Sequence, residues 1–174
     1  FSLLILLSGF SYKKVTKKTD KKTPSSANFY DLKAISIDGE EVSFEKYKGK
    51  KVLIVNVATK CGYTYQYEDM QKLNDLYEGK VAVLGFPAND FLFQESGSNE
   101  SIAEFCETVF GVTFDMFEKI TTKGRNQSPV YSWLSDSNLN GWNDQKPTWN
   151  FCKYLIDENG ELVAFFDSKV KPLS

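Results

Sequence analysis

An almost unbroken run of apolar residues from Val52 to Ala58 constrains the fold more than any other feature of this sequence. Such a run is typical of a strand buried on both faces, which occurs mainly in parallel sheets covered by helices. Cys61 follows after a short Thr59-Lys60 step, and a helical pattern begins near Gln66. Cys61 is therefore expected where a buried strand leads into a helix. The unpaired N–H groups and the positive dipole end of a helix stabilise an anion, so this position favours a thiolate.

The composition fits one globular domain and removes several classes of function. The chain has 174 residues, 41% of them hydrophobic, and a formal net charge of −2, which allows a buried core without disulfide bonds. The near-neutral charge argues against nucleic acid as the main partner, because a phosphate-binding surface needs a basic excess. The chain contains no histidine, which excludes Ser-His-Asp and Cys-His catalysis and most transition-metal sites. We therefore expect no metal and no cofactor.

The N-terminal residues are expected to precede the domain. Residues 1–10 are mostly apolar and resemble the core of a signal peptide, and lysines are frequent from 13 to 22. The lysine-rich stretch is typical of a solvated linker. We thus expect residues 1–28 to be a truncated signal-like segment and a linker, residues 29–174 to be the domain, and the protein to be exported, either periplasmic or membrane-tethered. Because lysines after an apolar segment disfavour translocation, a cytoplasmic location is the alternative.

The remaining patterns alternate between strands and helices. Residues 31–44 predict a β-hairpin around Asp38-Gly39. Helices are expected at 66–78, after an N-cap at Ser98, and at 128–135. Strands are expected at 81–86, 151–156 and 162–166, the last two joined by a tight turn containing Asn159-Gly160. The apolar helix positions are Met70, Leu73, Leu76 and Tyr77 in the first helix, and Ile102, Phe105, Cys106 and Val109 in the second.

This order of elements predicts the α/β class, with a central mixed β-sheet flanked by helices, right-handed parallel crossovers and an N-terminal β-hairpin. That is the thioredoxin-like fold.

Three stretches resemble motifs of the glutathione peroxidase family. Residues 55–67 resemble its cysteine motif, residues 85–99 its glutamine motif, and Trp149-Asn150-Phe151 its tryptophan-asparagine motif. The resemblance covers about residues 29–171, with the motifs in family order. It implies an active site made of Cys61, Gln94, Trp149 and Asn150, and a peroxidase that acts on hydrogen peroxide and on organic or lipid hydroperoxides in the response to oxidative stress.

These residue types suit peroxide reduction without histidine. The thiolate attacks one peroxide oxygen while the other leaves, and amide and indole N–H groups can donate hydrogen bonds to both oxygens without titrating. Taken singly, Gln94 could be a loop polar group, Trp149 a half-buried aromatic residue and Asn150 a cap. Their joint occurrence around a strand-helix cysteine favours the catalytic interpretation.

The sulfenic acid formed at Cys61 needs a second thiol before it is oxidised further. The resemblance places Cys106 where thiol-dependent members of the family carry a resolving cysteine. Cys106 also fits a buried core thiol. If it does resolve Cys61, its helix must loosen locally, because a disulfide needs Cα atoms within about 7 Å. Strand alternation puts Cys152 on the same face as Asn150. Cys152 is expected to be a core thiol and is the alternative resolving residue.

Two features bear on the partners. The chain has a single arginine, Arg125, although fixed basic groups would help to recognise the carboxylates of glutathione. The segment 135–148 is also shorter than the loop that tetrameric members use in assembly. Both favour thioredoxin as the reductant, with glutathione as the alternative, and a monomer or weak dimer.

The family usually continues beyond the position of Ser174 into a C-terminal helix that the printed sequence does not contain. The alternative function is a peroxide sensor that passes oxidation from Cys61 to a partner protein.

Overall fold

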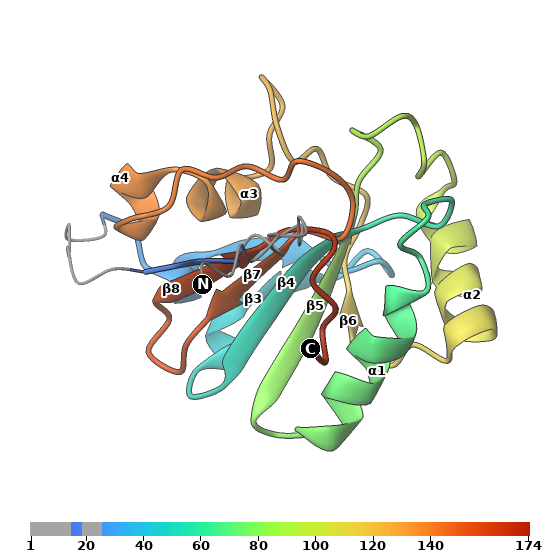
Figure 1. The fold of residues 1–174 in the computed structure, drawn as a ribbon, viewed down its shortest axis with the longest axis horizontal. Coiled ribbons are helices and arrows are strands. Elements are labelled where there is room, and N and C mark those ends of the chain that lie inside the picture. Colours follow the sequence, from blue (N-terminus) through green and yellow to red (C-terminus); the bar gives the residue numbers. More distant parts are fainter. Residues whose placement is uncertain (1–14, 19–25) are drawn as a thin grey trace, which may run out of the picture.

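A computed structural model describes residues 15–18 and 26–174, whose main feature is a six-stranded sheet with helices on both faces (Figure 1). The strand order is β1-β8-β7-β4-β5-β6. β4 (Lys51–Val57) pairs with β5 (Val81–Pro87) in parallel and with β7 (Lys153–Ile156) antiparallel. The short β6 (Asp115–Met116) extends the parallel side, and β8 (Leu162–Phe166) and β1 (Val15–Lys17) extend the antiparallel side. The mixed sheet confirms the predicted thioredoxin-like plan.

β4 separates two hydrophobic cores, as the apolar run predicts. Val52 and Ile54 point into one core, and Leu53, Val55 and Val57 point into the other. This alternation follows from the two-residue repeat of a strand. Every residue of β4 after Lys51 is buried.

The two cores are covered by different helices. α1 (Gln66–Leu76) and α2 (Asn99–Phe110) contribute to the core that contains Leu53, and we call this side of the sheet the α1–α2 face. α3 (Pro129–Leu134) contributes to the core that contains Val52, which we call the α3 face; α4 (Ser137–Asn140) packs against α3 on this side. The α3 face also receives the 3-10 segments η1 (Phe29–Asp31) and η2 (Phe44–Tyr47).

The helix starts agree with the predictions, including the N-cap at Ser98, whereas the end of α1 differs and some apolar positions are exposed. The side chains of Ser98 and Ser128 accept hydrogen bonds from the first turns of α2 and α3. α1 ends two residues before the predicted boundary at 78, and Leu76, Tyr77 and Val109 are 70%, 48% and 57% exposed. These apolar positions are exposed because each lies at or just beyond the last turn of its helix.

The hairpin of β2 (Lys33–Ile35) and β3 (Glu41–Ser43) is confirmed. The predicted linker, in contrast, includes β1, which pairs with β8, and Lys18 forms a 3.0 Å ion pair with Glu161. Edge pairing therefore orders part of a stretch whose composition predicts solvation. The signal-like residues 1–10 lie outside the described residues. In the part of the chain that the structure describes, no helix is long and apolar enough to cross a membrane.

Two strand details depart from the expected pattern. β7 begins at Lys153 rather than at 151, because Phe151 has a φ of 63° and cannot continue an extended strand. In the turn between β7 and β8, Gly160 alone has a positive φ, of 80°. The Oδ1 atom of Asp157 accepts hydrogen bonds from the N–H groups of Asn159 and Glu161 and stabilises this turn.

Candidate active site

Cys61 lies in a series of tight turns between β4 and α1. The Cys61 N–H donates to the Thr64 hydroxyl at 3.1 Å, and the Tyr63 N–H donates to the Cys61 sulfur at 3.4 Å. The side chain is half-buried against the core of the α1–α2 face. α1 begins only at Gln66. The backbone donor to the sulfur therefore comes from the turn that precedes the helix rather than from the first helical residue.

The structure brings Gln94 and Asn150 into direct contact. The Nδ2 group of Asn150 donates to Gln94 Oε1 at 2.9 Å. The main-chain carbonyl of Gln94 accepts a hydrogen bond from the main-chain N–H of Lys60 at 3.1 Å. Two of the predicted residues thus form one unit, and that unit is attached to the residue immediately before Cys61.

Trp149 and Asn150 lie in a turn that β4 holds in place. Asn56 Nδ2 donates to the Trp149 carbonyl at 2.9 Å, and the Asn56 carbonyl accepts from the Phe151 N–H at 2.6 Å. The half-buried Trp149 ring packs against Phe91, with 5.7 Å between ring centroids. Asn56 is a positioning residue that the motif analysis missed, and its signal was a single polar residue inside the apolar run.

Glu95 is the second missed residue. Its carboxylate is fully buried and accepts two hydrogen bonds from Thr59, one from the N–H at 2.9 Å and one from the hydroxyl at 2.7 Å. Burial raises the pKa of this carboxyl, while the Thr59 hydrogen bonds oppose that rise. Glu95 therefore attaches the loop between β5 and α2, which carries Gln94 (the glutamine loop), to the segment between β4 and α1, which carries Cys61 (the cysteine turn). Its sequence position, next to Gln94 in a polar loop, gave no indication that it would be buried.

Backbone strain is concentrated in the two segments that carry the amide residues. Among the described residues, the non-glycine residues with positive φ are Leu92 at 52°, Phe93 at 56° and Phe151 at 63°. Leu92 and Phe93 precede Gln94, and Phe151 follows Asn150. Left-handed backbone is unfavourable for such side chains and persists only where the surroundings enforce it, as at many functional sites.

The candidate resolving thiols lie on opposite faces of the sheet. Cys106 belongs to the core of the α1–α2 face, against which Cys61 packs, whereas Cys152 belongs to the core of the α3 face. All three cysteines are free thiols. The prediction that Cys152 shares a face with Asn150 assumed strand alternation, which the left-handed Phe151 between them interrupts.

The environments of these two thiols also differ. Cys106 is 2% exposed, and burial raises the pKa of its thiol to about 11, with the Tyr67 hydroxyl opposing the shift and the Glu95 charge adding to it. Cys152 is fully buried, with its sulfur 3.4 Å from the Ser168 hydroxyl.

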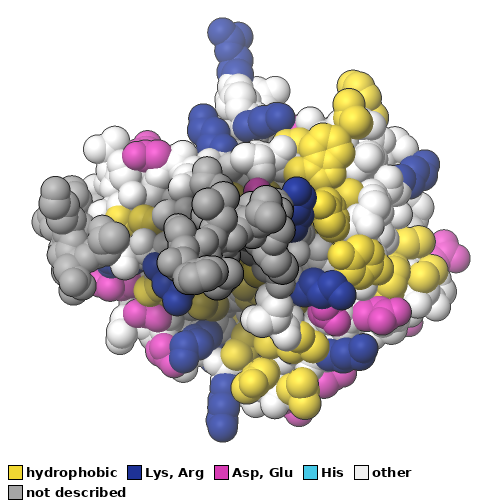
Figure 2. All heavy atoms as spheres, in the orientation of Figure 1, with side chains coloured by type: hydrophobic (Ala, Val, Ile, Leu, Met, Phe, Trp, Pro, Cys, Tyr) yellow, Lys and Arg dark blue, Asp and Glu magenta, His cyan; other side chains and the backbone are white. Residues whose placement is uncertain are grey.

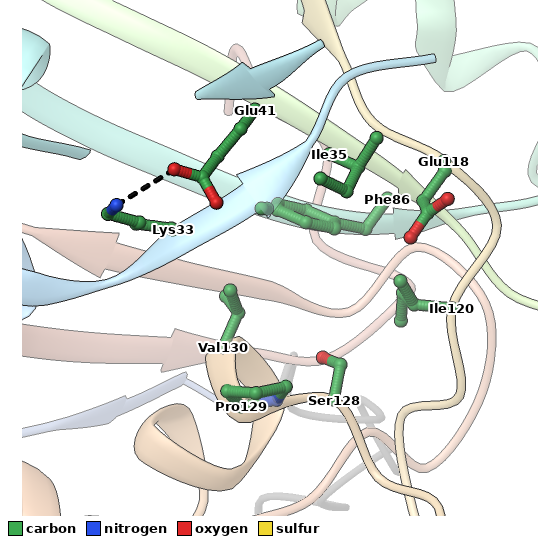
Figure 3. A pocket seen from close by; sticks show the side chains of 10 residues that line it. Lys33, Ile35, Glu41, Phe86, Glu118, Ile120, Ser128, Pro129 and Val130 are labelled. Atoms are coloured by element: carbon green, nitrogen blue, oxygen red, sulfur yellow. Dashed lines mark hydrogen bonds and ion pairs between the residues drawn. The ribbon is translucent and has the colours of Figure 1, made fainter. Parts of the chain in front are cut away.

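A pocket elsewhere on the molecule is separate from these residues. Figure 3 shows it between the β2–β3 hairpin and the start of α3, with the 2.8 Å Lys33–Glu41 ion pair on one side. Phe86 and Val130, which line it, belong to the core of the α3 face. The pocket therefore lies on the face opposite to Cys61. Within residues 15–18 and 26–174, no cluster of acidic or cysteine side chains could hold a metal ion.

Comparison with known proteins decides the family. The family model described as glutathione peroxidase matches residues 29–135. The chain belongs to the glutathione peroxidase family. Over 146 residues it is 43% identical to a glutathione peroxidase of Lactococcus lactis, and this alignment covers 83% of this chain and 92% of the relative. Over 150 residues it is 44% identical to glutathione peroxidase-like peroxiredoxin 2 of Saccharomyces cerevisiae, and this alignment covers 86% of this chain and 93% of the relative.

A solved structure supports the same family. The crystal structure of Trgpx in its apo form is 32% identical and superposes with a TM-score of 0.65, over 85% of this chain and 90% of that chain. The protein is therefore a peroxidase of the glutathione peroxidase family with a thioredoxin-like fold. This confirms the resemblance that the three motifs indicated.

Proposed function

We propose that this protein reduces hydroperoxides with Cys61 as the nucleophile. The Cys61 thiolate attacks one oxygen of ROOH, the O–O bond breaks, and the leaving RO⁻ takes a proton to become the alcohol, or water when R is hydrogen. Cys61 is oxidised to the sulfenic acid. Gln94, Trp149 and Asn150 supply neutral N–H donors to the peroxide oxygens as charge develops on them.

The hydrogen bond from Asn150 to Gln94 is the observation that carries this proposal. It makes Gln94 Oε1 the acceptor, so the NH₂ group of Gln94 is turned away from Asn150 and can donate to a peroxide. The Glu95 clamp holds the same loop against Thr59, two residues before Cys61. Preorganised donors of this kind contribute to catalysis because they need no rearrangement when the charge appears.

We assign the resolving role to Cys106. Its thiol attacks the Cys61 sulfenic acid, which releases water and leaves a Cys61–Cys106 disulfide. Both residues pack against the core of the α1–α2 face. Cys106 is buried on α2, so this step requires that helix to loosen locally. Cys152, on the opposite face, is a core thiol in this scheme.

A dithiol reductant then returns the enzyme to its starting state. Reduced thioredoxin is the proposed donor, and it is oxidised to its disulfide while Cys61 and Cys106 regain their thiols. The presence of a single arginine, Arg125, supports a protein dithiol over glutathione, because fixed basic groups would help to recognise the carboxylates of glutathione. We expect a monomer or weak dimer, and export remains the proposed location. A peroxide sensor would share the first step, but the relatives favour an enzyme.

The test is hydroperoxide consumption coupled to thioredoxin for the wild type, Cys61→Ser and Cys152→Ser. We expect Cys61→Ser to abolish turnover and Cys152→Ser to retain it. Persistent turnover in Cys61→Ser would refute the assignment of the nucleophile. Glutathione as the only donor, assayed in parallel, tests the choice of reductant.

A further inference from the structure

Lys153 is a buried lysine that the chemistry above does not use. It is the first residue of β7, and its side chain is among the largest that are almost fully buried. Its Nζ atom donates to the carbonyl oxygens of Phe151 at 2.7 Å, Val170 at 2.5 Å and Ser168 at 3.4 Å. Among the described residues, no carboxylate forms an ion pair with it. Burying an ammonium group is costly unless its donors are satisfied, so these carbonyl groups hold the charge in place.

One of these carbonyl groups belongs to the strained turn of the active site. Phe151 is left-handed, with its N–H bound to the Asn56 carbonyl and its own carbonyl bound to Lys153. Both main-chain polar groups of the strained residue are therefore fixed, one from each side. Asn150, which contacts Gln94, immediately precedes it. Loss of either restraint would let the turn relax toward a more favourable backbone conformation.

A second carbonyl group links Lys153 to the cysteine side of the site. The Ser168 carbonyl accepts both from Lys153 and from Gln66 Nε2, the latter at 2.7 Å. Gln66 is the fully buried first residue of α1, and its N–H donates to the Tyr63 carbonyl at 2.9 Å. Tyr63 is the residue whose N–H reaches the Cys61 sulfur. Lys153 thus lies where the segments that carry Asn150 and Cys61 are joined.

We propose that Lys153 is a positioning residue for peroxide reduction, whose ammonium fixes the Trp149–Phe151 turn so that Asn150 and Gln94 keep their catalytic geometry. This inference rests on the proposed function. Lys153 is almost fully buried and binds main-chain carbonyl groups, so it acts through Asn150.

The charges around Lys153 are consistent with an ammonium group at neutral pH. Burial lowers its pKa to about 8. The charges of three neighbouring groups oppose this shift: Cys152 just before β7, Asp167 just after β8, and Asp69 on α1. Even at the lowered value, most of the molecules carry the charge at pH 7.

The test is single-turnover oxidation of Cys61 by hydrogen peroxide, with iodoacetamide alkylation of Cys61 measured in parallel. Alkylation reports the reactivity of the thiol but does not need the amide donors. For Lys153→Met we expect oxidation to slow by roughly 10- to 100-fold, as for a misplaced catalytic group, with alkylation unchanged within about twofold. The control is Lys51→Met, which removes an exposed lysine at the start of the neighbouring strand β4 and should leave both rates unchanged.

Conservative replacement separates positioning from bulk stability. Lys153→Arg keeps a positive charge and N–H donors, and it should oxidise at least about tenfold faster than Lys153→Met. If the Met variant does not fold, a folded Arg variant within about tenfold of the wild type supports the role, and one slowed more than about 100-fold overturns it.

Three results for a folded Met variant would overturn the proposal: a wild-type oxidation rate, alkylation slowed as much as oxidation, or new alkylation of Cys106 and Cys152, which would indicate general loosening. Failure of the wild type to be oxidised at Cys61 would be a different result, because it would refute the proposed function itself.

Discussion

The two faces of the sheet each bury a cysteine, but their surroundings differ. On the α1–α2 face, Cys106 shares a core with the residues that pack around Cys61. On the α3 face, Cys152 belongs to the other core, which includes Phe86, Tyr131 and Tyr154. The two thiols are almost equally inaccessible, at 2% and 0% exposure. Burial therefore does not distinguish the proposed resolving thiol from the proposed core thiol, whereas the side of the sheet on which each lies does.

The loop that carries Gln94 has unusual backbone and exposed apolar side chains. The left-handed Leu92 and Phe93 are 74% and 78% exposed and lie in the loop between β5 and α2. In Figure 2, hydrophobic side chains gather over the part of the surface that the α1 and α2 segments form. The loop that carries Gln94 thus combines exposed apolar side chains with left-handed backbone.

The largest expected effect separates the two buried cysteines. Cys106→Ser should lower thioredoxin-coupled turnover by about 100-fold or more, because the Cys61 sulfenic acid then has no internal thiol to condense with. Cys152→Ser should retain turnover within about twofold. Steady-state peroxide consumption measures both. The reverse pattern would place the resolving thiol on the α3 face.

The next effect compares two clamps on the same loop. Glu95 binds the N–H and hydroxyl groups of Thr59, and Asp90 binds the same two groups of Thr122 at 2.7 and 2.9 Å. Glu95→Gln should slow the oxidation of Cys61 by roughly 10- to 100-fold, because it displaces Gln94 from the cysteine turn. The matched control Asp90→Asn should change that rate by less than about threefold. Stopped-flow oxidation by hydrogen peroxide gives both rates. Equal losses of rate in the two variants would contradict a specific role of Glu95 in positioning Gln94.

The pH dependence of resolution tests whether α2 opens first. Burial raises the pKa of the Cys106 thiol to about 11, and a thiol becomes a nucleophile only as its thiolate fraction grows with pH. If α2 opens before reaction, Cys106 titrates near its ordinary pKa of about 8.5. We therefore expect disulfide formation to accelerate up to about tenfold per pH unit above pH 7 and to level off near pH 9. Quench-flow measurements that show a continued rise toward pH 11 would mean that Cys106 reacts from its buried position.

The smallest effect concerns strain. Leu92→Gly should stabilise the protein by about 1 kcal/mol, because glycine adopts positive φ without a steric penalty. This corresponds to a rise in Tm of about 2–4 °C. Leu76→Gly, at an equally exposed leucine in the last turn of α1, should instead destabilise by about 0.5–1 kcal/mol. Thermal unfolding of both variants measures these shifts, and a loss of stability in Leu92→Gly would show that no strain is stored there.

Patterns with a strong physical origin were predictable from the sequence. The apolar run fixes a central strand buried on both faces, and β4 is that strand. Ser98 and Ser128 mark helix starts because their side chains satisfy backbone N–H groups. The motif order also predicted that Gln94 and Asn150 act together, and their side chains are hydrogen-bonded.

What the sequence did not predict depends on tertiary contacts. β1 forms only because β8 offers an edge, and β6 is too short to give a periodic signal. Glu95 and Lys153 are of residue types that are usually exposed. Both are buried here because backbone or hydroxyl groups form hydrogen bonds with their charged groups. The left-handed Phe151 shifted the start of β7 and removed the alternation that had linked Cys152 to Asn150.

The most direct test of the account is to map the disulfide formed after one equivalent of hydrogen peroxide. The reduced wild-type protein is oxidised, quenched in acid with a thiol-blocking reagent, digested, and its cross-linked peptides are identified by mass spectrometry. We predict a Cys61–Cys106 disulfide, with Cys152 recovered as a thiol. A Cys61–Cys152 disulfide would contradict the central claim that resolution takes place on the α1–α2 face.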